Sequence, residues 1–96
     1  METKDLIQLK PFCEIHQVGV SLLTTLHEFS LIKIIYLNTE AYIDPAELPK
    51  LEKLIRLHVE LNINPEGLDA VFHLLEKMQA MQHEIRALQE KLKIYE

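Results

Sequence analysis

The fold is decided by the middle of the chain, residues 18–43, which have the sequence VGVSLLTTLHEFSLIKIIYLNTEAYI. The first half of this stretch carries apolar side chains at three- and four-residue steps, the spacing of one face of a helix. These side chains are Leu22, Leu23, Leu26 and Phe29. We therefore expect a helix over residues 20–29, separated from the upstream segment by a break at Val18-Gly19.

The second half of the stretch has the composition of two short strands. Residues 32–36 are rich in β-branched and aromatic side chains, residues 37–40 contain turn formers, and residues 41–43 are again mostly apolar. This order predicts a β-hairpin that follows the helix as a wing.

The segment upstream of Val18 predicts another short helix. Residues 6–9 suit an extended lead-in, and residues 10–17 have the apolar density of a short buried helix. Pro11 fits the first turn of that helix, where a missing N–H costs nothing. The side chains expected to be buried there are Phe12, Cys13 and Ile15, with His16 beside them. Two short helices joined by so tight a turn predict a helix-turn-helix.

A third helix is predicted to follow the hairpin. Asp44 is placed to cap it, Pro45 suits its first position, and Glu47 can reach back to form a capping box. A wide apolar band continues the helix to about Asn62, which predicts a central position in the fold. This band consists of Leu48, Leu51, Leu54, Ile55, Leu57 and Leu61.

The segment Asn64-Pro65-Glu66 predicts the start of a long helix that runs towards Glu96, with a capping Asn, a first-turn Pro and an acid favoured by the helix dipole. Apolar residues repeat along it in heptads. Position a holds Val71, Met78, Ile85 and Leu92, and position d holds Leu74, Met81, Leu88 and Tyr95. We refer to these eight residues as the seam and expect it to pair two chains as a homodimer. The alternative is that the seam packs on its own head domain, and the flanking charges do not distinguish parallel from antiparallel pairing.

Together these elements predict a mainly α fold in a single domain, residues 1–96. A winged helix-turn-helix head with a short β-hairpin wing covers residues 6–63, and a long C-terminal coiled-coil helix covers residues 64–96.

Composition limits the possible partners and the compartment. The 96 residues carry a net charge of −5, from 15 acidic and 10 basic side chains, and the basic ones are spread along the chain. That balance disfavours binding to nucleic acid phosphates. The polar start, Met1 to Asp5, and the absence of a long apolar run predict neither a signal peptide nor a membrane span. The single cysteine, Cys13, fits a reducing compartment, so we expect a cytoplasmic protein.

Enzymatic and metal chemistry are not indicated by the sequence. Cys13 and His16 share a helix face, but two ligands do not make a zinc site, and we expect Cys13 to pack in the core. His58 is expected to be a partly buried structural residue. Since no glycine-rich loop or nucleophile–base pattern is present, we expect no catalysis and no cofactor.

The second helix decides between a DNA partner and a protein partner. In a helix-turn-helix protein this helix enters the major groove with Arg, Lys, Asn or Gln side chains, and residues 18–32 contain none of these. An outer stripe that suits a protein partner is predicted instead, consisting of Leu22, Thr25 and Glu28. The alternative for Leu22 is packing against the wing or a second copy. Further candidates for contact with a basic partner are Glu47, Glu52 and Glu60, although such charges often form only a solvated face.

The layout resembles the MerR-type winged helix-turn-helix, and within that group the chaperone modulator CbpM family. The likeness is carried by Phe12-Cys13 with His16, residues 28–32, residues 55–61, residues 63–68 and the ending at residues 93–96. This resemblance implies a regulator that binds the J domain of a CbpA/DnaJ-like co-chaperone and blocks its stimulation of a DnaK-type chaperone. The competing interpretations are a MerR-like DNA-binding regulator and a dimeric scaffold for some other protein.

Overall fold

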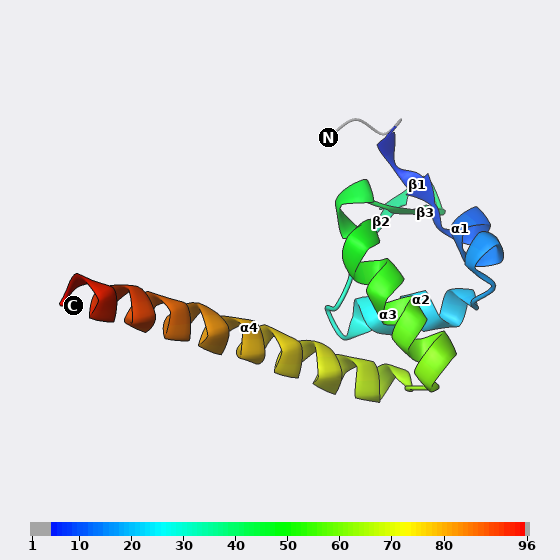
Figure 1. Ribbon diagram of the computed structural model, residues 1–96. Coiled ribbons are helices and arrows are strands. Elements are labelled where there is room, and N and C mark those ends of the chain that lie inside the picture. The colour runs from blue at the N-terminus through cyan, green and yellow to red at the C-terminus, as the bar shows by residue number, and fades with distance from the viewer. Residues whose placement is uncertain (1–4, 96) are drawn as a thin grey trace.

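The computed structural model describes residues 5–95 (Figure 1). The first four residues of the predicted polar start, and Glu96 at the predicted end of the long helix, therefore lie outside the described residues. The described chain is elongated, with extents of 60 × 34 × 21 Å, because one helix extends far beyond a small head.

The predicted helix-turn-helix is confirmed. Helix α1 (Leu9–His16) and helix α2 (Val20–Glu28) are joined by a turn in which Gln17 adopts a left-handed conformation with φ 56°. The N–H of Val18 donates to the carbonyl of Cys13 over 3.0 Å, which satisfies an end carbonyl of α1 and starts the chain towards α2.

The predicted wing is also confirmed, and it is part of a larger sheet. Strands β2 (Ile34–Leu37) and β3 (Glu40–Ile43) form an antiparallel hairpin whose two loop residues, Asn38 and Thr39, both have positive φ. Such a loop matches the right-handed twist of the strands. The extended lead-in contains strand β1 (Ile7–Gln8), which pairs with β3 and gives the strand order β1-β3-β2.

The third helix begins differently from the prediction. A 3-10 turn (Pro45–Glu47) precedes helix α3 (Leu48–Leu61), and the Asp44 carboxylate accepts the N–H of Ala46 over 3.0 Å. The reciprocal bond, in which the Glu47 carboxylate would accept the Asp44 N–H, is not among the hydrogen bonds of residues 5–95, so the predicted capping box is wrong. The 3-10 turn is the reason, because it makes Glu47 the residue before α3 instead of a residue within its first turn.

Helix α4 (Pro65–Ile94) begins as the sequence predicts. The side-chain oxygen of Asn64 accepts the N–H of Gly67 over 2.7 Å, and Pro65 occupies the first helical position. Figure 1 shows α4 leaving the head as one long continuous helix whose far end contacts no other element.

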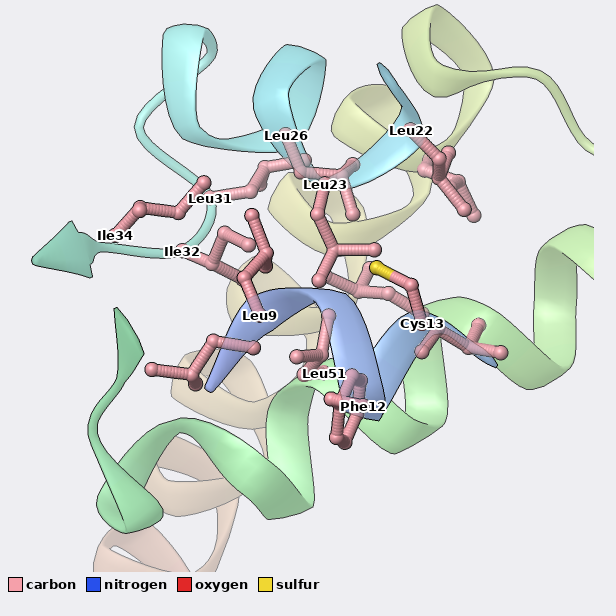
Figure 2. Close-up of a cluster of buried hydrophobic side chains, with 14 residues drawn as sticks. Leu9, Phe12, Cys13, Leu22, Leu23, Leu26, Leu31, Ile32, Ile34 and Leu51 are labelled. Atoms are coloured by element: carbon pink, nitrogen blue, oxygen red, sulfur yellow. The ribbon is translucent and has the colours of Figure 1, made fainter. Parts of the chain in front are cut away.

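The core lies between α1, α2, the sheet, α3 and the first turn of α4 (Figure 2). Its fourteen buried side chains are Leu9, Phe12, Cys13, Leu22, Leu23, Leu26, Leu31, Ile32, Ile34, Ile43, Leu51, Leu54, Ile55 and Leu68. The predicted burial of Ile15 is wrong, because this side chain is 79% exposed. Two residues along a helix correspond to about 200°, so Ile15 faces away from the side on which α1 buries Cys13.

Candidate interaction surfaces of the head and of helix α4

The predicted outer stripe of α2 is only partly correct. Leu22 is 8% exposed and belongs to the core, so its prediction as a partner-binding residue is wrong. The spacing of Leu22, Leu23 and Leu26 makes a buried face wide enough to include all three. Thr25 is half-buried and Glu28 is exposed. Whether those two residues contact a partner stays a prediction.

The two threonine hydroxyl groups of α2 are directed back to their own helix. Thr24 Oγ1 donates to the carbonyl of Val20 over 3.0 Å, and Thr25 Oγ1 donates to that of Ser21 over 2.9 Å. A hydroxyl has one proton, so each of these oxygens can offer an outside group only its lone pairs. The outward side of α2 therefore has the two threonine acceptors, the Ser21 hydroxyl and one carboxylate, Glu28, but no long basic or amide side chain.

The three acidic candidates near α3 are not equivalent. Glu47 is half-buried before the start of the helix, while Glu52 and Glu60 are exposed and lie about two turns apart. A role for any of them in contacting a partner stays a prediction.

His27 fastens α2 to the wing, a role that the sequence did not reveal. The N–H of Ile34 donates to His27 Nδ1 over 3.1 Å, and the His27 and Tyr36 rings form a T-shaped pair with 6.2 Å between centroids. Accepting this bond requires that Nδ1 carry no proton. The bond occupies an N–H that would otherwise lie unpaired on the outer edge of β2.

A groove lies between α1, α2 and the hairpin, with a volume of about 460 Å³. We call it the wing groove. Its lining includes Lys10, Val20, Thr24, Tyr36, Glu40 and Ala41. Val20 and Tyr36 are among the exposed large apolar residues of the head, at 40% and 59% exposure. This groove could not be predicted from the sequence, because its residues come from separate elements and only the fold brings them together.

A second groove, of about 290 Å³, lies between α3 and α4. Its apolar lining comes from Leu54, Leu57, Phe72 and Leu75, and two cations border it, Lys50 and Lys53. The Lys50 Nζ lies 4.1 Å from the centroid of the Phe72 ring, which is a cation–π contact. This groove, here called the α3–α4 groove, adjoins the start of the seam.

Residues 7–90 match the family described as MerR HTH family regulatory protein. The chain belongs to this family. The match covers the helix-turn-helix, the wing, α3 and most of α4. Searches of curated proteins and of solved structures found no match.

The seam of this MerR-family chain is exposed along most of its length. Val71 is half-buried, but from Leu74 onwards the seam residues are between 53% and 87% exposed. The head therefore does not cover the seam, and the alternative that the seam packs only on its own head is wrong. Pairing of two MerR-family chains through the seam stays a prediction.

Cys13 and His58, which were considered for metal or catalytic chemistry, are buried and half-buried in the head. Cys13 is buried, and that burial raises the pKa of its thiol. His58 is half-buried, as expected, and its Nδ1 lies 2.8 Å from the carbonyl oxygen of Ile63. In the part of the chain from Asp5 to Tyr95, no three His, Cys, Asp or Glu side chains are grouped so as to hold a metal ion. None of the helices within these residues is long and apolar enough to cross a membrane.

Proposed function

We propose that this MerR-family protein is a non-catalytic chaperone modulator. In this proposal its head binds the J domain of a CbpA/DnaJ-like co-chaperone and prevents that domain from stimulating a DnaK-type chaperone. One observation carries the proposal: helix α2 bears no Arg, Lys, Asn or Gln. In this architecture α2 is the helix that reads DNA.

Helix α2 lacks the side chains with which a recognition helix contacts DNA. A recognition helix binds phosphates and base edges through long donor side chains, and each phosphate contact contributes through the release of counterions. The charged or ring side chains of α2 are His27, which accepts the Ile34 N–H, and Glu28, which repels phosphate. With a net charge of −5, the chain as a whole adds to that repulsion.

An acidic head suits a basic protein partner. A J domain engages DnaK through a basic helix, and opposite charges speed and orient the encounter of two proteins. The resemblance to the CbpM family, which includes the end of α3 and the start of α4, supports this choice of partner. The proposed location is the cytoplasm, because the co-chaperone acts there on a cytosolic DnaK-type chaperone.

The proposed active form is a homodimer that is paired through the seam of α4. An apolar stripe about six turns long on one exposed helix is unfavourable in water, and a second copy of the same stripe would bury it. The exposure of Ile85 and Leu88, each slightly above one half, supports this part of the proposal.

Calorimetric titration with the purified J domain of the same organism's CbpA-like protein tests the proposal. We expect saturable binding at moderate salt with a defined ratio, and loss of J-domain stimulation of DnaK ATPase activity. The charge reversal Glu28→Lys should weaken binding if α2 takes part, because it replaces an attraction with a repulsion. Absence of both heat and co-elution for the unaltered protein would reject the modulator function.

A DNA-binding regulator is the second candidate, favoured by the family match and the winged architecture. This alternative predicts binding to duplex DNA that weakens steeply as salt is raised. Sequence-specific retardation of duplex DNA, together with no heat from the J domain, would favour it over the modulator.

A further inference from the structure

We propose that the wing groove is the docking site for a cationic side chain of the J-domain partner, presented by a basic segment. This inference rests on the function proposed above and identifies the surface that performs it. It replaces the contact expected from Leu22, which lies in the core.

The lining of the groove holds one carboxylate and one cation, and the helices and strands beside it carry more acids than bases. Helix α2 and the hairpin strands β2 and β3 together carry two carboxylates, Glu28 and Glu40, and no Lys or Arg. Glu40 lines the groove itself. Lys10 of α1 is the cation in the lining, and the exposed Glu14 lies one helical turn further along the same helix.

The uncharged lining is suited to the stem and the head of a long cation. The Tyr36 ring is 59% exposed, and its face can hold an ammonium or guanidinium group. Val20 provides apolar surface for the methylene stem. Because the Thr24 hydroxyl already donates to the Val20 carbonyl, its oxygen faces outside groups as an acceptor, which matches a partner that only donates.

The α3–α4 groove is the less suitable of the two grooves. It is bordered by Lys50 and Lys53, which would repel a basic segment. Phe72 and Leu75 in its lining lie beside the seam residues, so pairing of two α4 helices would use that side of the molecule. The lining of the wing groove comes from β1, α1, α2 and the hairpin, and seam pairing uses none of those residues.

The test compares matched variants of the full chain in titrations with the J domain. Glu40→Lys in the groove is matched by Glu90→Lys on α4, since both substitutions of an exposed acid change the net charge by the same amount. Val20→Arg in the groove is matched by Ser21→Arg next to it. Circular dichroism and thermal melting check that each variant folds.

We expect both groove variants to weaken binding by about tenfold or more, and both controls to stay within about twofold of the unaltered protein. Lys10→Ala should strengthen binding by about twofold or more, because it removes the repelling cation of the lining. A gain of affinity cannot arise from misfolding, so this variant keeps the test decisive.

The outcomes separate the two proposals. If the unaltered protein binds but the groove variants bind equally well, or if Glu90→Lys alone abolishes binding, the wing groove is not the docking site. If the unaltered protein does not bind the J domain at all, the proposed function fails, and the groove assignment fails with it.

Discussion

The seam of α4 can be tested by placing charge at its centre. We choose the double substitution Ile85→Asp with Leu88→Asp, because both side chains belong to the seam and lie far from the head core. They are 53% and 54% exposed in the single chain, so about half of each side chain's surface is available to a partner. We expect the double variant to be a monomer at concentrations where the unaltered protein is a dimer.

The magnitude follows from the exposed fractions. Full burial of a Leu or Ile side chain contributes about 1.5–3 kcal/mol, so burial of the exposed half contributes about 1 kcal/mol. A dimer contains four such side chains, two from each protomer, which gives about 4 kcal/mol. At about 1.4 kcal/mol per factor of ten, dimer dissociation should become about a thousandfold more favourable. Four carboxylates facing an apolar interface add a further desolvation cost of the same sign.

Sedimentation equilibrium over a dilution series gives the mass and the dissociation constant together. The unaltered protein should have twice the chain mass of 11.2 kDa, and the variant should have the mass of one chain. The control is His83→Asp with Ala87→Asp, which adds two aspartates to exposed positions outside the seam. A monomeric unaltered protein, or an unchanged dissociation constant for the seam variant, would refute the reasoning.

Four further changes test the fold by denaturant and thermal unfolding. Asn64→Ala should lower the free energy of unfolding by about 1 kcal/mol, whereas Asn64→Asp should retain most of it, because an aspartate still accepts the 2.7 Å bond from the Gly67 N–H. Gly67→Ala should lower the melting temperature although alanine favours helices, because its Cβ would lie 2.7 Å from Ile63 Cγ2; a higher melting temperature would contradict this. Leu51→Ala should cost about 3 kcal/mol, because Leu51 is 0% exposed, and a cost below about 1 kcal/mol would contradict its central position. Burial raises the pKa of the Cys13 thiol above its ordinary 9.0, so the unfolded chain ionises first and stability should fall above about pH 9; iodoacetamide should react slowly with the folded protein, and fast native alkylation would contradict the burial.

Most of the elements could be predicted because their signals are local. The Asn64-Pro65 start of α4, the break at Gly19 and the turn formers at Asn38-Thr39 each act within a few residues of chain. Strand β1 was not predicted as part of the sheet, because two residues carry too little pattern and their pairing with β3 depends on contacts more than thirty residues away. The 3-10 turn before α3 was not predicted either. Pro45 and Glu47 suit the first turn of a 3-10 helix as well as that of an α-helix, so the sequence does not distinguish the two.

The candidate site was harder to predict because it depends on which face of a helix is covered. The leucines of α2 are close enough in sequence that one turn can bury two or three of them, and the core covers Leu22 as well as Leu23. The error at Ile15 is the opposite one: its burial was predicted, but this apolar side chain of a short helix is exposed. The wing groove combines Val20 and Tyr36 from elements sixteen residues apart, and neither residue marks a site in isolation.

The distribution of buried residues separates folding from assembly in this protein. Of the fourteen core side chains, thirteen come from the segment between Leu9 and Ile55, and α4 contributes only Leu68. A substitution beyond about residue 80 therefore removes no core contact, and the head should fold whether or not two seams are paired. Because the wing groove is also built without α4, J-domain affinity per head should survive the loss of the dimer. A monomeric seam variant that no longer bound the J domain would show instead that both heads, or the paired helices themselves, form part of the binding surface.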